Sequence, residues 1–196
     1  MQSLMIRTAQ FEDLPDIVCL ENTEWCEEQR CTLDNFSLRL NHFQNGFLVA
    51  YINNKIVASF YAIRRHHHIG KLMNWKEESG HGTGNTHDPR GDSLFSVSIT
   101  VSHQAPKGVY RKMMEAWRAL AIKQNVKCMY AGSRIPGLRQ QHETPNRYLA
   151  KVKSGEIFDP ILSKAIYCGF SIGNLIPNYF GDPESLHYGV EIFQII

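Results

Sequence analysis

The chain has 196 residues, of which 43% are hydrophobic and 20% are charged, and its formal net charge is +2 with histidine neutral. This size and composition predict a globular protein with one core, and we expect a single domain over residues 1–196. The small charge, without a basic run among aromatic residues, argues against nucleic acid or a membrane surface as a partner. No apolar run approaches the length of a membrane span, and residues 1–16 lack the apolar core of a signal peptide.

The five cysteines predict neither a disulfide framework nor a structural zinc site. Their number is odd, and no two of them have the Cys-x-x-Cys spacing. We therefore expect reduced thiols and a cytoplasmic protein. The cysteines are Cys19, Cys26, Cys31, Cys128 and Cys168.

The first third of the chain predicts a strand, two helices and a hairpin. Residues 5–9 are typical of a short strand, and Asp13 is placed to cap a helix with Pro15 in its first turn. Thr32 is placed to cap a second helix, whose core-facing residues would be Phe36, Leu40 and Phe43. Two β-rich runs, 47–52 and 56–61, flank a pair of asparagines that tolerate the positive φ of a tight turn.

Residues 66–92 show no clean period, so we expect a long loop there. The loop contains three consecutive histidines, 66–68. Consecutive side chains on an extended chain point to opposite faces, so these histidines converge poorly on one ion, and no metal site is predicted.

The second half begins with the clearest strand, because apolar and polar residues alternate strictly from Phe95 to Val101. A helix over 108–124 follows, with Met113, Trp117 and Leu120 on one face, then a strand over 126–131 and an irregular stretch over 132–157. Asp159 and Pro160 open a short helix that ends at Gly169. Strands beginning near Phe170 and Tyr188 complete an order that predicts a mixed sheet covered by helices.

This order, together with the strand at 95–101 and the helix that opens at Gly108, resembles the GNAT superfamily of acyltransferases. The resemblance implies an α/β (α+β) fold with a mixed, mostly antiparallel sheet of about seven strands and four helices. In that family the loop and helix start wrap the pyrophosphate of coenzyme A, where free N–H groups and the helix dipole favour an anion. The implied cofactor-binding residues are Ile99, Thr100, Val101, Lys107, Gly108, Val109, Tyr110, Arg111 and Lys112.

A longer pattern in the C-terminal third resembles a GNAT subgroup found with carbon–nitrogen hydrolases and the GNAT-like loading domains of polyketide synthases. The pattern comprises Asp-Pro-Ile-Leu at 159–162, Gly-Phe at 169–170 and residues 177–190. Trp25 with Arg30, the hairpin, residues 87–92 and Gly-Ser-Arg-Ile-Pro-Gly at 132–137 also match. The resemblance covers nearly the whole chain.

The chain departs from the family pattern at three places. Ala105 and Tyr110 replace the first and last residues of the family's phosphate loop, so only Gly108 of that signature remains. Ala165 stands where many GNAT enzymes carry the tyrosine that protonates the leaving thiolate. Decarboxylating loading domains use a histidine, a threonine and an arginine at the positions that align with Ala165, Ala131 and Phe180, so malonyl decarboxylation is not expected.

Several side chains are candidates for the reaction site. Trp25 is interpreted either as an acyl-pocket residue or as an ordinary packed aromatic, while Ser133 and Arg134 follow the end of a strand, where sites of α/β sheets often lie. Tyr167 lies about 200° around a helix from Ala165 and would face elsewhere unless the helix has ended. Tyr179 lies in a stretch that turn chemistry alone would also explain. The candidate catalytic residues are Trp25, Ser133, Arg134, Tyr167 and Tyr179.

The resemblance implies an enzyme, an N-acyltransferase that moves an acyl group from a thioester to a small-molecule amine by direct attack. The donor would be acetyl-CoA or another acyl-CoA, or the phosphopantetheine arm of an acyl carrier protein. The departure at Tyr110 favours a carrier protein as donor, because a carrier-borne arm lacks the adenosine diphosphate part that the phosphate loop would bind. The alternatives are S-acyl transfer onto a carrier protein in polyketide or secondary-metabolite biosynthesis, and a non-catalytic module that binds an acyl thioester or a protein.

Overall fold

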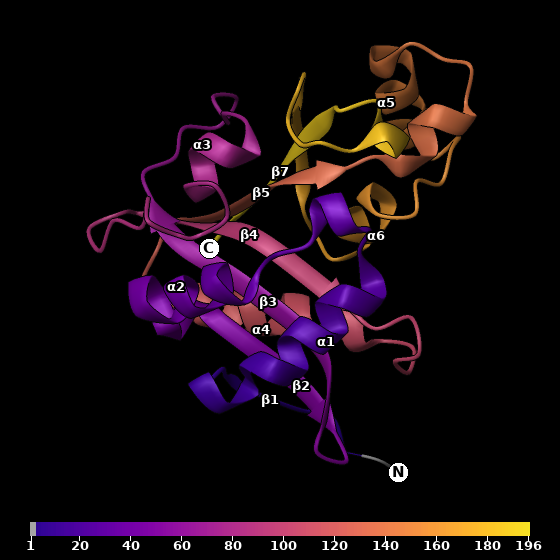
Figure 1. The fold of residues 1–196 in the computed structure, drawn as a ribbon. Helices are drawn as coiled ribbons and strands as arrows, with labels where there is room; N and C mark the ends of the chain where they lie inside the picture. The colour runs from indigo at the N-terminus through magenta and orange to yellow at the C-terminus, as the bar shows by residue number, and fades with distance from the viewer. Residues whose placement is uncertain (1–2) are drawn as a thin grey trace.

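The computed structural model describes residues 3–196. Its centre is a seven-stranded sheet in the order β1-β2-β3-β4-β5-β7-β6. In Figure 1, β1 and β2 lie at the bottom of the sheet, and β5 and β7 lie above β4. The predicted sheet of about seven strands is therefore confirmed. The strands are β1 Met5–Thr8, β2 Phe47–Ile52, β3 Lys55–Arg65, β4 Ser93–Val101, β5 Cys128–Arg134, β6 Ser171–Ile176 and β7 Gly189–Ile195.

Neighbouring strands are antiparallel except β4 and β5, which are parallel. A parallel pair needs a crossover, and α4 supplies it. The β4–β5 pairing is short, because only residues 93–95 of β4 face residues 128–130 of β5. Beyond this point the two strands separate, and this separation positions the site.

Helices cover both faces of the sheet (Figure 1). One face carries α1 and α2, which bury Leu14, Ile17, Phe36 and Leu40 in a single cluster with strand residues. The opposite face carries α4, α5 and α6 over a second cluster around Trp117. The helices are α1 Leu14–Glu24, α2 Leu33–Phe43, α3 Trp75–Ser79, α4 Val109–Lys123, α5 Pro145–Ser154 and α6 Leu162–Tyr167.

A β-bulge at Val97 changes which residues of β4 face each layer. Ser98 pairs with Tyr61 of β3 but Ser96 pairs with Ala62, so Val97 is an extra residue without a partner on β3. An extra residue shifts the two-residue side-chain period by one. Phe95 therefore packs in the cluster beneath α1 and α2, which we call the α1/α2 cluster. Ile99 and Val101 instead pack against the cluster around Trp117 on the opposite face, which we call the α4 cluster. The single apolar face expected from strict alternation is wrong for this reason.

Most local chemistry read from the sequence is confirmed. The Thr32 side chain accepts a hydrogen bond from the Asn35 amide at 3.2 Å and caps α2. Asn53 and Asn54 have φ values of 51° and 61° in the β2–β3 turn. The Asp159 carboxylate accepts from the amides of Ile161 and Leu162 at the start of α6.

Three expectations are corrected. Asp13 precedes α1 but its carboxylate binds Arg7 and the Gln10 amide instead of capping that helix. The stretch over 66–92, expected to be a loop, contains the helix α3. The stretch over 132–157, expected to be irregular, contains the end of β5 and the helix α5. The described residues therefore form six α-helices instead of the expected four. Between residues 3 and 196 there is no helix with the length and apolar character needed to cross a membrane.

Candidate active site

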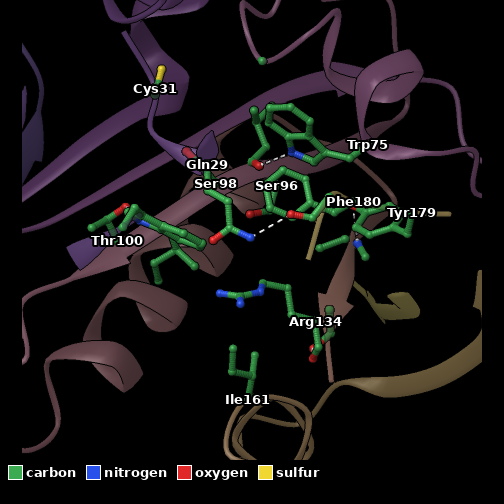
Figure 2. A pocket seen from close by; sticks show the side chains of 18 of the residues that line it. Gln29, Cys31, Trp75, Ser96, Ser98, Thr100, Arg134, Ile161, Tyr179 and Phe180 are labelled. Atoms are coloured by element: carbon green, nitrogen blue, oxygen red, sulfur yellow. Dashed lines mark hydrogen bonds between the residues drawn. The ribbon is translucent and has the colours of Figure 1, made fainter. Parts of the chain in front are cut away.

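The separation of β4 and β5 opens a cleft of about 890 Å³. Residues 96–101 of β4 have no partner on the β5 side, so the backbone groups of that edge face the cleft instead of a neighbouring strand. Figure 2 shows Ser96, Ser98 and Thr100 on one side of this space and Arg134 and Ile161 on the other. The Val97 carbonyl accepts from the Trp75 indole. The other backbone groups on this edge have no strand partner, and such an edge is suited to an extended ligand that carries amide groups.

A hydrogen-bonded chain from α1 to β4 forms one wall. The Trp25 indole Nε1 donates to the Thr100 hydroxyl at 2.9 Å, and that hydroxyl donates to Glu21 Oε2 at 2.8 Å. The other carboxylate oxygen of Glu21 accepts from the Cys31 amide at 3.0 Å. The wall therefore presents an indole and a buried carboxylate to the cleft, both held by the same hydroxyl.

The β4 bulge is held from the α3 side. The Trp75 indole donates to the Val97 carbonyl at 2.7 Å, and its ring meets Phe180 edge to face at 5.1 Å. The Gln29 side chain donates to the Gly181 carbonyl at 2.8 Å and links the segment after α1 to the loop before β7 (Figure 2). These contacts fix the bulge and the rim above it.

Arg134, at the end of β5, lies on the far wall. Its guanidinium makes a two-point contact with Asp182 at 2.7 and 2.9 Å and lies 5.1 Å from the centre of the Trp25 ring. Burial opposes ionisation of Asp182, but hydrogen bonds from Arg134 and Ser185 outweigh it and hold the pKa of this carboxyl below its usual value. The pair is thus ionised at neutral pH.

Tyr179 packs between β5 and β7. Its hydroxyl accepts from the Gly132 amide at 3.1 Å, and its ring lies over Gly132 and Gly189, where any Cβ would clash. Burial raises the pKa of Tyr179, so the phenol stays neutral. Gly132 and Gly189 thus leave space for the Tyr179 ring, and this ring forms part of the cleft wall.

The start of α4 follows the C-terminal end of β4 along the chain. Gly108 has φ 97°, and a Cβ added there would meet no atom within 4 Å, so the approach to the first turn of α4 is open. Tyr110 is half-buried against the α4 cluster, and burial raises the pKa of its hydroxyl. Its ring therefore packs into the protein and lines the cleft, leaving the space beside Gly108 open.

The structure brings most of the candidate residues of the sequence to the cleft. Those that line it are Trp25, Ile99, Thr100, Val101, Tyr110, Ser133, Arg134 and Tyr179. Ser133 is buried and its hydroxyl donates to the Arg134 carbonyl. Tyr167 is 85% exposed on α6 and is not among the lining residues. Around Gly108, Val109 is buried in the core, while Lys107, Arg111 and Lys112 are solvent-facing at the start of α4.

The sequence candidates did not include many of the residues that line the cleft, and three of these matter for the chemistry: Glu21, Arg39 and Trp75. A signal existed for the first two, because each replaces an apolar residue within the buried stripe of its helix. Glu21 continues the spacing of Leu14 and Ile17, and Arg39 lies between Phe36 and Leu40. Trp75 gave no such signal, because α3 was not expected. Among residues 3–196, no three His, Cys, Asp or Glu side chains are grouped to hold a metal ion.

Solved structures match this arrangement of sheet, split and helices along the whole chain. The GNAT-like decarboxylase GphF in complex with isobutyryl-CoA superposes with a TM-score of 0.84 at 23% identity, over 97% of this chain and 98% of that one. The loading GNATL domain of CurA from Lyngbya majuscula also gives 0.84, at 20% identity and over 98% of both chains. The chain has the GNAT fold. The resemblance on which the sequence analysis rested is confirmed.

Two curated proteins of Bacillus subtilis (strain 168) are similar in sequence to this GNAT-fold chain. One is named "Uncharacterized N-acetyltransferase YkwB" and is 29% identical over 96% of this chain and 87% of its own length. The other is named "Probable hydrolase YhcX" and is 25% identical over 92% of this chain, which spans only 36% of that longer protein. No protein-family model matches the chain. These similarities support an acyltransferase as the class of enzyme.

Proposed function

We propose that the protein transfers an acyl group from an acyl thioester to an amine. The observation that carries this proposal is the split between β4 and β5, which leaves residues 96–101 without a strand partner on that side, along a cleft that reaches Tyr110 of α4. A pantetheine arm has two amides that can bond to such an edge. A diphosphate suits the N–H groups of a helix start.

The proposed donor is an acyl-CoA. Gly108 leaves the approach to α4 open, and the half-buried ring of Tyr110 does not occupy that space. The basic side chains nearby add positive charge, although Lys112 and Arg111 also pair with Glu115. A carrier-borne arm would use the same β4 edge without the α4 site, so a donor comparison separates the two.

In the proposed reaction the neutral amine attacks the thioester carbonyl carbon, and the carbonyl oxygen becomes an oxyanion. A backbone N–H of the unpaired β4 edge stabilises that charge. Collapse of the intermediate breaks the C–S bond, the thiolate takes up a proton, and the amine nitrogen loses one. The products are an amide and a free thiol, and the enzyme contributes mainly by positioning the two reactants.

No side-chain acid is assigned to the leaving thiolate. Ala165 is buried with no ionisable group, and Tyr167 is directed to solvent. Water at the open cleft therefore supplies this proton. Ala165, Ala131 and Phe180 also take the places of the decarboxylating residues, so decarboxylation forms no part of the proposal.

Ligand-induced stabilisation tests the donor site. We expect thermal unfolding of the full chain to shift upwards by about 5–10 °C with an acyl-CoA at about 100 times its dissociation constant. A release assay for free thiol with a panel of amines then measures turnover, and mass spectrometry of an offered carrier protein detects S-acyl transfer. Binding without turnover on any acceptor would leave a thioester-binding module and refute the proposed reaction.

Thr100 provides a matched pair of variants for the α1–β4 wall. We expect T100V to lose about 1–3 kcal/mol of folding free energy, because the Trp25 indole and Glu21 both lose their partner. We also expect kcat/KM for acyl transfer to fall about tenfold as this wall loosens. T100S keeps the hydroxyl and should stay within about 1 kcal/mol of the wild type. Urea denaturation and the thiol assay measure both effects, and equal behaviour of the two variants would contradict the role given to the hydroxyl.

A further inference from the structure

Arg39 is a buried cation at the cleft. The residue is 2% exposed, extends from α2 and lines the cleft. Its Nε donates to the Gly82 carbonyl at 2.7 Å and its Nη1 to the Ser98 hydroxyl at 2.8 Å. Both acceptors are neutral, and within residues 3–196 no aspartate or glutamate oxygen lies within 4.0 Å of the guanidinium.

Neutral partners satisfy only part of this group. A guanidinium has five N–H donors, and two of them are used. The rings of Phe36 and Tyr61 lie 5.0 and 5.3 Å from its central carbon and provide weak cation–π contacts. A charge taken out of water without an anion is costly. Since the cleft is the open side of Arg39, an anionic group bound there would complete its coordination.

Glu21 is the matching buried anion. It is 6% exposed and lines the same cleft. Its two oxygens accept from the Thr100 hydroxyl and the Cys31 amide, and no basic side chain between residues 3 and 196 lies within 4.0 Å of them. The cleft therefore holds one buried cation and one buried anion, each paired only with neutral groups.

The two charged side chains are held by neighbouring positions of β4. Arg39 is bonded to Ser98 and Glu21 to Thr100, two residues apart on the same face of the strand (Figure 2). Two residues of a strand span about 6.5–7 Å. A small molecule that carries both a carboxylate and an amine is of the size needed to reach both charged side chains along this stretch of β4.

We propose that the amine acceptor is an amino acid, whose carboxylate binds Arg39 and whose amine lies beside Glu21. The binding of the amino acid is independent of the proposed function, whereas the acylation of its amine rests on that function. Arg39 and Glu21 belong to the α1/α2 face, whereas the start of α4 and its open diphosphate site belong to the opposite face. The acceptor therefore approaches the split in β4 from the side opposite the donor. Glu21 positions the amine at the cleft, and the ammonium loses its proton to solvent before the nitrogen attacks.

Binding is tested first, without any donor. Isothermal titration of the full chain with a panel of L-amino acids and with their carboxamides compares ligands that differ only in the anionic group. We expect the best amino acid to bind about 10- to 100-fold more tightly than its carboxamide. R39M removes the charge at similar length and should abolish this preference, whereas R39K, which keeps the charge, should retain part of it. E21Q should weaken binding of the amino acid and of the carboxamide alike, because both carry the ammonium.

Turnover is measured next with acetyl-CoA. R39M should raise KM for the amino acid by about 10- to 100-fold and leave KM for acetyl-CoA unchanged. The assignment is overturned if no amino acid binds, if carboxamides bind equally well, or if R39M raises KM for malonyl-CoA but not for acetyl-CoA, which would place a donor carboxylate on Arg39. Amino-acid binding without acylation would instead refute the proposed function and leave the binding site standing.

Discussion

Replacing Asp182 with alanine should cost about 3–5 kcal/mol of folding free energy, the largest loss we expect from a single polar side chain of this protein. Asp182 is 1% exposed and accepts two hydrogen bonds from Arg134, one from the Ser185 hydroxyl and one from the Glu184 amide at 3.2 Å. Ser185 in turn accepts from the Ile135 amide at 2.9 Å. The Asp182 carboxylate and the Ser185 hydroxyl together join the end of β5 to the loop before β7.

The expected loss corresponds to a Tm lower by roughly 6–20 °C for a chain of this length. Glu184 provides the control, since its carboxylate is 64% exposed and reaches the same Arg134 at 3.4 Å. An exposed pair of this kind contributes little, so E184A should stay within about 0.5 kcal/mol of the wild type. Equal losses in D182A and E184A would show that Arg134 needs only a nearby negative charge and that the buried geometry is unimportant.

The same carboxylate gives a pH dependence with a defined sign. The pKa of Asp182 is held below its usual value of 3.8. A group whose pKa is lower in the folded state contributes stability above its unfolded-state pKa, and that contribution disappears as the pH falls through the folded value. The difference in unfolding free energy between wild type and D182N should therefore be constant from about pH 5 to 7 and shrink below about pH 4. Denaturant titrations at several pH values measure it, and a difference that grows in acid would contradict the assignment.

Local chemistry explains which parts of the fold could be predicted. Caps and turns depend on residues close in sequence, so Thr32, the pair Asn53–Asn54 and Gly169 marked their elements correctly. The helix α5 was missed although Thr144 caps it, Pro145 opens it and Gly155 ends it in a left-handed conformation. Its buried residues Tyr148, Leu149 and Val152 have helical spacing, so the sequence of α5 did carry the pattern of an amphipathic helix.

Non-local packing explains what could not be predicted. The bulge at Val97 arises from how β4 pairs with β3, and the sequence of β4 alone does not predict it. The burial of Arg39 and Glu21 depends on two β4 hydroxyls, from Ser98 and Thr100, that the bulge turns towards α1 and α2. The resemblance supplied the edge of β4 and the start of α4 as candidates, and of these Ile99, Thr100, Val101 and Tyr110 line the cleft. Arg39 and Glu21 were not part of that resemblance, although the sequence shows each of them at an apolar position of its helix.

Replacing Gly108 with valine should raise KM for acetyl-CoA about 100-fold, and the effect should vanish when acetyl-pantetheine is the donor. Gly108 leads into α4 with φ 97°, and a Cβ added there would meet no atom within 4 Å apart from those of its chain neighbours. A branched side chain there would occupy the approach to the N–H groups of the first turn. Loss of two hydrogen bonds to a charged diphosphate accounts for about 3 kcal/mol or slightly more, which is about 100-fold in affinity. Pantetheine lacks the diphosphate and would use only the β4 edge.

The backbone strain of G108V needs its own control, because a β-branched residue at positive φ costs about 1–2 kcal/mol wherever it is placed. Gly155 supplies it: this glycine lies at the end of α5, not at the start of α4, with φ 79°, and has no atom within 4 Å of an added Cβ. G155V should lose a similar amount of stability while its KM for acetyl-CoA stays at the wild-type value. If G108V raises KM for acetyl-CoA and acetyl-pantetheine equally, the first turn of α4 does not bind the diphosphate. The donor would then be recognised through its arm alone, as expected of a carrier-borne thioester.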